Sequence, residues 1–488
     1  MRKLYLPLAL AVAALASGCT LAPHYERPEA PIAGAYPSGA AYQHNLAATE
    51  PLAAADLGWQ DFFGDPRLKQ LIALALHNNR DLRVAMLNVQ ASRDQYQIER
   101  AGLFPTLGVN ASQSSGRTPA SLSNTGQAVV SHDYQVGGAA QWELDFFGRL
   151  QSLKNQALYQ YLATAEARQS AEILLVSEVA DQYLTLRASE EQLEVTNATL
   201  KSSQASYQLA LDQFKAGTAS ELDLRQAQTV VDLALANLAA QNRAQAQAEN
   251  ALVLLVGESL PADLPAGLPF DDGRMVANVP AGLPADLLTR RPDIMAAEDS
   301  LRAANANIGA ARAAFFPTIS ITGSGGSASS MLSGLFKAGS AAWTFVPNLT
   351  LPIFTAGSNL ANLDLAHVEK NIAVAQYEKT IQSAFREVAD GLAASGTYSD
   401  QLFAQMRYTF DYRRTLDLST LRYQAGTDSY LQVLTAQNAL YSAQQNEISS
   451  RLNFWTTRID LYGALGGGWI AKTGDAPRDA AALPSGKA

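Results

Sequence analysis

The sequence contains a single cysteine, Cys19, among its 488 residues. One cysteine excludes an internal disulfide framework and a zinc site built from cysteines. After the first few residues there is no run of about 18 apolar residues, so no transmembrane helix is expected. Charge is scarce as well, because Asp, Glu, Lys and Arg make up 17% of the chain, against roughly 25% in an average soluble protein.

The motifs that would mark an enzyme or a nucleic-acid-binding protein are also missing. The formal net charge is −9, and neither a basic run nor an acidic tail concentrates it, which disfavours a nucleic-acid partner. The five histidines lack the HExxH spacing, and the sequence has no Gly-x-Ser-x-Gly, no phosphate loop and no GxGxxG after a strand. The six methionines are dispersed. We therefore expect no enzyme activity, no catalytic residue, no metal site and no cofactor apart from a covalent lipid.

The N-terminus explains the lone cysteine. Arg2 and Lys3 precede an apolar run over residues 4–16, and small residues then lead to Cys19, which is typical of an export signal. The segment Ala-Ser-Gly-Cys at 16–19 resembles a bacterial lipobox, with Ala16 where that pattern usually has leucine. The resemblance implies cleavage before Cys19, acylation of its thiol, and sorting to the outer membrane. The alternative is an ordinary cleavage site followed by a buried thiol.

An internal repeat organises the rest of the chain. The matched segments are 81–82 with 293–294, 104–107 with 316–319, and 214–218 with 423–427. The first two pairs share an offset of 212 residues and the third an offset of 209. The chain is therefore expected to contain two tandem copies of one unit. The predicted domains are a lipoprotein signal peptide at 1–18, an N-terminal lipid-anchored segment at 19–66, repeat 1 at 67–257, a Pro-rich connector at 258–285, repeat 2 at 286–467, and a flexible C-terminal tail at 468–488.

Each copy contains one very long helical stretch. Residues 149–216 and 358–425 lack proline, and each stretch of 68 residues would be about 100 Å long as a helix. A second helix is predicted after Gly217 and after Gly426. Apolar residues there recur every seven positions, at Leu224, Val231 and Leu238 and at Val433 and Leu440. This spacing favours helices packed along their length as a coiled coil.

Each copy also contains two candidate strands in which apolar and polar residues alternate. The apolar positions are Leu107, Val109, Ala111, Tyr134, Val136, Trp142, Leu144 and Phe146 in the first copy, and Ile319, Ile321, Phe345, Leu349, Leu351 and Ile353 in the second. Strands of about ten such residues are typical of an outer-membrane barrel, although a soluble half-buried sheet has the same pattern. Aromatic residues at the strand ends favour the barrel and predict a periplasmic-side girdle of Phe104, Phe146, Phe147, Phe315, Phe316 and Phe354.

Four strands cannot close a barrel, and an open sheet edge in lipid leaves backbone groups without hydrogen-bond partners. The predicted barrel must therefore be shared between chains. Two chains would supply eight strands, whose side chains nearly fill the interior, whereas three chains would supply twelve and leave a passage. The strand count by itself leaves both possibilities open.

Several segments resemble the TolC superfamily, and within it the lipid-anchored outer-membrane factors of tripartite efflux systems (the OprM and NodT group). The resemblance covers about residues 18–469. The segments that carry it are residues 18–28, 142–149 (Trp-Glu-Leu-Asp-Phe-Phe-Gly-Arg), 288–294, 303–317 and 461–469. It implies a mainly helical homotrimer with a shared twelve-stranded membrane barrel and a periplasmic tunnel of long helices.

The resemblance also implies the function. The protein would be a passive exit duct for antibiotics and other small amphipathic compounds. An inner-membrane pump of the resistance-nodulation-division (RND) type would supply the energy, and a periplasmic adaptor, or membrane fusion protein, would join pump to duct. The alternatives are a TolC-like duct for type I protein secretion, a duct for heavy-metal efflux, and an envelope lipoprotein without a pore.

The two predicted helix–helix turns are the candidate functional sites. Glycine suits a tight turn because it adopts the left-handed backbone conformation. The resemblance implies that these turns are the periplasmic tips that meet the adaptor, which makes Gly217, Thr218, Gly426 and Thr427 candidate contact residues. A gate is expected nearby, because a permanently open duct would leak. Its candidate pore-lining residues are Glu221, Asp223, Tyr423, Asp428 and Gln432.

Overall fold

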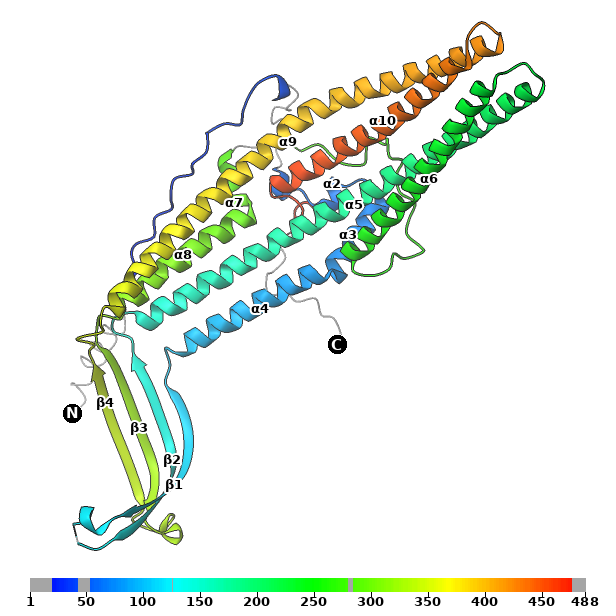
Figure 1. Cartoon of the computed structure of the whole chain (residues 1–488). Coiled ribbons are helices and arrows are strands. Elements are labelled where there is room, and N and C mark those ends of the chain that lie inside the picture. The colour runs from blue at the N-terminus through cyan, green and yellow to red at the C-terminus, as the bar shows by residue number, and fades with distance from the viewer. Residues whose placement is uncertain (1–19, 43–52, 125, 280–283, 476–488) are drawn as a thin grey trace. The chain divides into compact units, whose positions relative to one another are not determined.

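The computed structural model describes residues 20–42, 53–124, 126–279 and 284–475 (Figure 1). Before the first copy lie η1 (Ala40–Tyr42), η2 (Ala54–Asp56) and α2 (Trp59–Phe62). The elements of the first copy are α3 (Pro66–Asn78), α4 (Arg80–Ala101), β1 (Thr106–Thr118), η3 (Ala120–Leu122), β2 (Val129–Leu144), α5 (Arg149–Lys215) and α6 (Glu221–Val256). Those of the second are η4 (Pro284–Asp286), α7 (Leu287–Arg290), α8 (Pro292–Ala313), β3 (Thr318–Ser329), η5 (Leu332–Gly334), β4 (Ala341–Thr350), α9 (Ser358–Gln424) and α10 (Tyr430–Ala464). The predicted mainly helical fold, with two copies of one element order and four strands, is confirmed.

The four strands form one antiparallel sheet in the order β1-β2-β3-β4. Thr106 pairs with Gln141, Trp142 with Ile321 and Ile319 with Leu349, so the starts of β1 and β3 lie at the same end of the sheet as the ends of β2 and β4. All residues of β1 and β4 are exposed in the single chain. The sheet therefore has two unpaired edges, and both carry exposed apolar side chains such as Val109.

The last strand is shorter than the sequence pattern predicts. β4 ends at Thr350, so Leu351 and Ile353 follow the strand instead of lying on its apolar face. Proline has no backbone N–H for a strand ladder, and Pro352 stands between these two residues. Alternation of apolar residues therefore continued past the point where the backbone could pair.

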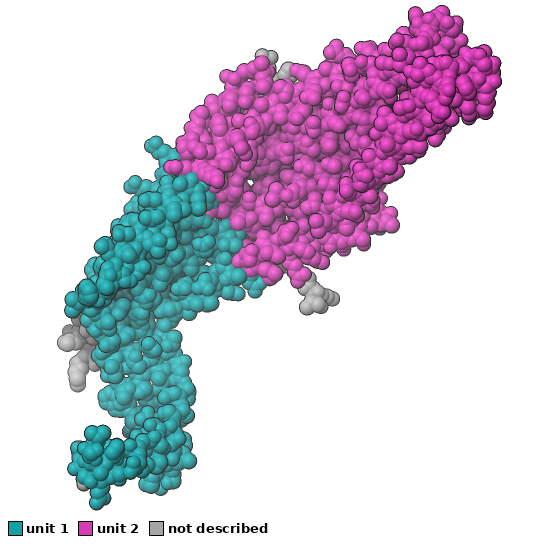
Figure 2. All heavy atoms as spheres, in the orientation of Figure 1, with its two compact units in different colours: residues 1–29, 90–164, 297–377 teal, residues 30–89, 165–296, 378–488 magenta. Residues whose placement is uncertain are grey.

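The chain divides into two compact units, coloured separately in Figure 2. Among the described residues, the first unit comprises 20–29, 90–164 and 297–377 and holds the sheet with the adjoining helical segments. The second comprises the described parts of 30–89, 165–296 and 378–488 and holds α6, α10 and the parts of α5 and α9 that lead to the two hairpin turns. Each unit therefore draws segments from both sequence copies.

Equivalent contacts recur in the two copies. Gly257 ends α6 with φ 81°, and Gly466 follows α10 with φ 84°. A Cβ at Gly257 would lie 2.5 Å from the carbonyl oxygen of Asn78, and a Cβ at Gly466 would lie 2.7 Å from that of Arg290. Both positions require glycine, because another backbone segment passes too close for a side chain.

The segment Arg290-Arg291-Pro292-Asp293 is a helix start. Pro292 opens α8, and Arg291, which is buried, donates to the carbonyl oxygen of Ala464 at 2.7 Å. Arg291 also forms ion pairs with Asp293 and Glu387. A charged side chain is stable there because its donors are paired with carboxylates and a helix C-terminus.

Asp65 joins three parts of the second unit. The carboxylate caps α3 by accepting from the backbone N–H of Arg67 at 2.8 Å. It also accepts from the Tyr183 hydroxyl of α5 at 2.9 Å and from the Leu268 N–H of the connector at 3.0 Å. A fully buried carboxylate is tolerated here because both of its oxygens are hydrogen-bonded.

Every helix within the described ranges is too short or too polar to cross a lipid bilayer. In the same ranges, no cluster of three or more His, Cys, Asp or Glu side chains is arranged to hold a metal ion.

Candidate functional site

The helical hairpins α5–α6 and α9–α10 each end in a tight turn (Figure 1), and equivalent glycines lie in the two turns. Gly217 has φ 73° between α5 and α6, and Gly426 has φ 74° between α9 and α10. The N–H of Thr218 donates to the Gln213 carbonyl at 2.9 Å, and the N–H of Thr427 donates to the Arg422 carbonyl at 3.0 Å. These bonds reach back five residues past a left-handed glycine, as in a Schellman helix end.

The surroundings of both turn glycines are open. A Cβ at Gly217 or at Gly426 would meet no atom within 4 Å. The hydroxyls of Thr218 and Thr427 donate back to the same carbonyls as their own N–H groups, at 3.0 and 2.9 Å. The turns are therefore closed by local backbone bonds, and their outer surface is free of contacts within the described chain.

The helices that follow the turns begin differently. Ser220 and Asp223 form a capping box at the start of α6, in which Asp223 accepts from the Ser220 N–H at 3.1 Å and Ser220 accepts from the Asp223 N–H at 3.2 Å. Ser429 precedes α10 without a side-chain cap bond. One candidate gate carboxylate, Asp223, is therefore already engaged in stabilising a helix N-terminus.

The two hairpins pack against each other just behind their turns. A buried apolar cluster joins residues of α5, α6 and α10: Ala210, Ala227, Val230, Tyr430, Val433 and Leu434. Tyr423 of α9 packs on this cluster, and its hydroxyl donates to the side-chain oxygen of Gln213 at 2.6 Å. The Tyr423–Gln213 bond is therefore one of several polar contacts between the two hairpins, along with that from Gln437 to Ser202, and it lies beside the apolar seam.

The remaining gate candidates lie on the surface of the hairpins. Asp428 accepts two hydrogen bonds from the guanidinium of Arg422, and these bonds hold the pKa of the Asp428 carboxyl below its usual value. Glu221 pairs with Arg225 one helical turn later, at 3.3 Å. The side chain of Gln432 is exposed. Both carboxylates are thus partnered locally, which reduces the net charge they present to a passage.

Three partners of these residues were not anticipated from the sequence. Ser220 could have been found, because a serine three residues before an aspartate at a helix start is a capping signal. Gln213 and Arg422 could not, because their roles depend on contacts formed after the helices turn back. Gln213 and Tyr423 are 210 residues apart in the chain.

The six aromatic residues predicted as a girdle all lie next to strand ends. Phe104 precedes β1, Phe315 and Phe316 precede β3, and the others follow β2 and β4. The sheet register puts these strand ends at one end of the sheet. The rings of Phe147 and Phe316 stack with centroids 4.8 Å apart. Their place at one rim agrees with a girdle, and the lipid contact itself stays a prediction.

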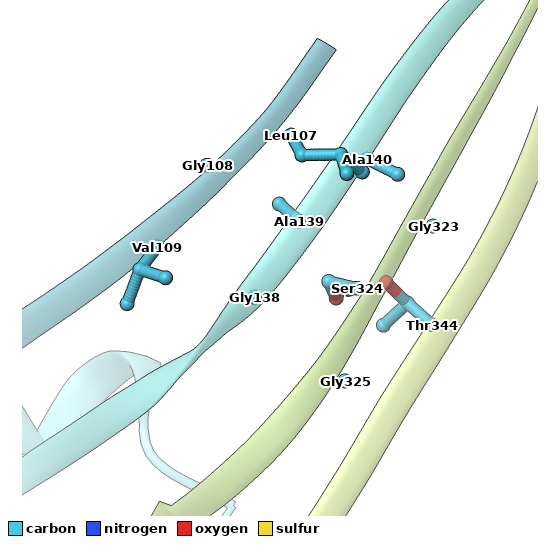
Figure 3. Close-up of a pocket in the computed structure, with 10 residues that line it drawn as sticks. All are labelled: Leu107, Gly108, Val109, Gly138, Ala139, Ala140, Gly323, Ser324, Gly325 and Thr344. Carbon is cyan, nitrogen blue, oxygen red and sulfur yellow. Dashed lines mark hydrogen bonds between the residues drawn. The ribbon is translucent and has the colours of Figure 1, made fainter. Parts of the chain in front are cut away.

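The sheet also carries a hollow lined by small residues (Figure 3). The hollow has a volume of about 640 Å³, and its lining residues are Leu107, Gly108, Val109, Gly138, Ala139, Ala140, Gly323, Ser324, Gly325 and Thr344. Glycines on three adjacent strands leave the ribbon bare there, as the close-up shows. The small side chains allow the sheet to bend sharply.

The predicted lipidation site, Cys19, lies outside the described residues, which begin at Thr20. The proposed acylation therefore rests on the sequence pattern.

Comparison with known proteins identifies the class to which this architecture belongs. Residues 71–258 and 283–467, well over half of the chain, match the model of the outer membrane efflux protein family. The protein is thus an outer-membrane efflux channel of the TolC type, and the chain belongs to the outer membrane efflux protein family. The predicted family, function class and outer-membrane location are confirmed.

Individual relatives cover nearly the whole chain. The solvent efflux pump outer membrane protein SrpC of Pseudomonas putida is 50% identical over 457 residues, which is 93% of this chain and 96% of SrpC. The antibiotic efflux pump outer membrane protein ArpC of the same species is 48% identical, over 97% of this chain and 98% of its own. The open-state crystal structure of the Neisseria gonorrhoeae MtrE outer membrane channel is 40% identical and has a TM-score of 0.84, covering 94% of this chain and 100% of MtrE.

Proposed function

We propose that this protein is the passive exit duct of a tripartite pump that expels organic solvents, antibiotics and other small amphipathic compounds. The observation that supports this cargo is the similarity to SrpC and ArpC, at 50% and 48% identity over nearly the full chain. In this proposal the chain performs no chemistry of its own. An RND pump in the inner membrane supplies energy, and a periplasmic adaptor joins pump to duct.

The assembly that we propose is a homotrimer. The unpaired edges of β1 and β4 support it, because an open sheet edge is unstable in lipid. Three copies of a four-stranded sheet supply twelve strands, enough for a barrel with a passage, whereas eight strands would be nearly filled by side chains. In this arrangement β4 of one chain pairs with β1 of the next.

We further propose that Cys19 carries the lipid anchor and that the hairpin turns are the adaptor-binding tips. The open surface around Gly217 and Gly426 supports the second assignment, since a partner can approach both turns without displacing any described side chain. The gate lies beside these tips in this proposal. Tyr423 is its best-supported member, because its bond to Gln213 must stretch or break if one hairpin swings away from the other.

A deletion strain tests the cargo. We expect loss of this chain to lower the tolerated concentrations of toluene and of several antibiotics several-fold, with recovery when the wild-type gene is restored. The strain must lack other outer-membrane ducts that could substitute. Unchanged tolerance to every organic compound would contradict the proposal. Loss of metal tolerance alone would indicate a heavy-metal duct, and loss of a secreted protein would indicate type I secretion.

A further inference from the structure

The first described residues of the chain, 20–27, are bound along one stripe of α8. The stripe consists of Glu298, Arg302, Asn305, Gly309 and Arg312, whose spacing of four and three residues puts them on one helix face. Residues 20–27, here named the strap, contact each of them in turn. The segment and the stripe both belong to the first compact unit.

The acidic end of the stripe holds the strap by charge. Arg27 donates to both oxygens of Glu298, at 3.0 and 2.7 Å, and the Tyr25 hydroxyl donates to Oε1 at 3.0 Å. Arg302 donates to the same carboxylate at 2.8 Å, and its guanidinium lies 5.2 Å from the centroid of the Tyr25 ring. The Glu298 side chain is only 4% exposed, so a charge-assisted bond to it is strong and costly to lose.

The other end of the stripe holds the strap through its backbone. The side-chain amide of Asn305 donates to the carbonyl oxygen of Pro23 at 2.8 Å, and Arg312 donates to that of Leu21 at 3.1 Å. Between them, Gly309 leaves room for the strap, because a Cβ there would lie 2.7 Å from the backbone nitrogen of Ala22. These contacts act on the main chain and so fix the register of the strap.

The strap is antiparallel to α8, and its first residue lies where helices give way to strands. Leu21 contacts the last turn of α8, which precedes β3. The hydroxyl of Thr20 lies 3.4 Å from that of Ser152 in the first turn of α5, just after β2. Pro23 fixes its own φ, and Pro23 and the following Pro28 disfavour the helical conformation at Ala22 and Arg27, which lowers the entropy that the strap loses on binding.

We propose that the α8 stripe is a positioning site for the lipid-bearing N-terminus. It holds the strap in one register, so that the acyl group on Cys19 enters the membrane at the helix–strand junction, at the sheet end that carries the aromatic residues. Consecutive α carbons are about 3.8 Å apart, so holding Thr20 fixes the point from which a chain bearing an acyl group on the preceding residue must start. This inference rests on the proposed lipidation of Cys19.

A disulfide tests where the strap lies. In the full-length chain, Thr20→Cys with Ser152→Cys replaces the two neighbouring hydroxyls by thiols. Cys19 is the only native cysteine and would be acylated, so no other thiol competes. We expect the bond to form in most chains on mild oxidation. Adding Arg27→Ala and Asn305→Ala should slow disulfide formation about fivefold or more, since each lost hydrogen bond weakens strap binding by about 1 kcal/mol. A disulfide that never forms, or that forms equally fast after Arg27 and Asn305 are replaced by alanine, would overturn the proposal.

Restoring the strap contact with the disulfide tests whether strap binding serves assembly in the outer membrane. Arg27→Ala with Asn305→Ala should reduce the share of acylated chains recovered from outer membranes as detergent-resistant oligomers, and the oxidised disulfide should restore that share. The matched control is Asn359→Ala, which removes the same type of amide–carbonyl bond, to Ala314 at 2.8 Å, in the same unit, from a pair in which neither partner belongs to the strap. The positioning role would be refuted if the double variant gave a normal share of oligomers, or if that share stayed low after the disulfide had formed.

The mass of the mature N-terminus tests the lipidation of Cys19 separately from the binding of the strap to the α8 stripe. An unmodified Cys19 in the wild-type protein would disprove the proposed lipidation, while the rate of disulfide formation would still report whether the stripe binds the strap. A lipidated protein that fails the rescue would instead disprove the positioning role alone.

Discussion

At the scale of single residues, Asp181 of α5 carries a carboxyl group with a strongly raised pKa. Burial, followed by the nearby carboxylates of Asp460 and Glu178, raises the pKa of Asp181 to about 8. Its Oδ1 atom is buried without a hydrogen-bond partner among the described residues. A buried carboxyl group without a cation beside it is held in its neutral form at pH 7.

This pKa shift predicts a dependence of stability on pH. The unfolded carboxyl ionises near pH 3.8 and the folded one near pH 8, so in between the folded protein binds more protons. Its free energy of unfolding therefore falls as pH rises through this window. We expect Asp181→Asn to flatten the decline in the thermal midpoint measured between pH 5 and 9. Asp417→Asn, on the exposed surface of α9, is the control and should leave the slope unchanged.

Tyr423 supports a second prediction at this scale. Tyr423→Phe removes the hydroxyl that joins the hairpins but keeps the ring that packs on their apolar seam. We expect it to destabilise the paired hairpins by about 1 kcal/mol and to raise the conductance of the resting channel in planar bilayers. Tyr408→Phe is the matched control, because that hydroxyl lies beside Tyr412 on the same helix. Equal conductance of the wild type and Tyr423→Phe would remove Tyr423 from the gate.

At the scale of elements, the hairpin turns were the best-predicted features. The Ala-Gly-Thr segments lie at equivalent positions of the two copies, and Gly217 and Gly426 adopt the left-handed conformation that such turns require. The reason is local: a helix without proline continues until a residue that can reverse the backbone ends it. Strand ends were predicted less well, since alternation continued to Ile353 while pairing stopped at Thr350.

The open space around the turns leads to a prediction about the partner. We expect Gly426→Trp to abolish solvent and drug resistance, because its side chain would stand where a partner approaches the turn. Oligomers should still assemble, because a Cβ there meets nothing in its own chain and the strain of a bulky residue at positive φ stays local to the turn. Gly426→Asn should retain function, since asparagine tolerates positive φ. Susceptibility assays and native gels measure the two effects.

The control for this prediction is Gly339→Trp. Gly339 also has positive φ (92°) and open surroundings, but it lies in the connection between β3 and β4 and not in a hairpin turn. Full resistance in the Gly426→Trp strain would show that this turn makes no essential contact.

At the scale of the whole molecule, the sheet and the helices impose different requirements. The helices satisfy their backbone hydrogen bonds internally, whereas β1 and β4 each leave one edge unpaired. Exposed apolar residues continue along these edges, with Leu107 at 82% and Trp343 at 79% exposed in the single chain. Such a sheet needs a neighbour on each side and lipid on one face, which is why the strands make assembly obligatory in the proposed trimer.

The sequence by itself determined the features that depend on neighbouring residues. Periodicity showed long helices and alternating strands, the two offsets showed the repeat, and glycine marked the turns. Only the tertiary structure decided which polar groups meet. Tyr423 and Gln213 are 210 residues apart, and Arg27 and Glu298 are 271 apart. Contacts of this kind depend on how helices pack, and side-chain spacing along one helix carries no information about the helix or strap that will face it. The lipidation of the lone cysteine was predicted from the residues beside it in the sequence, whereas the contacts of the strap that follows it are seen only in the tertiary structure.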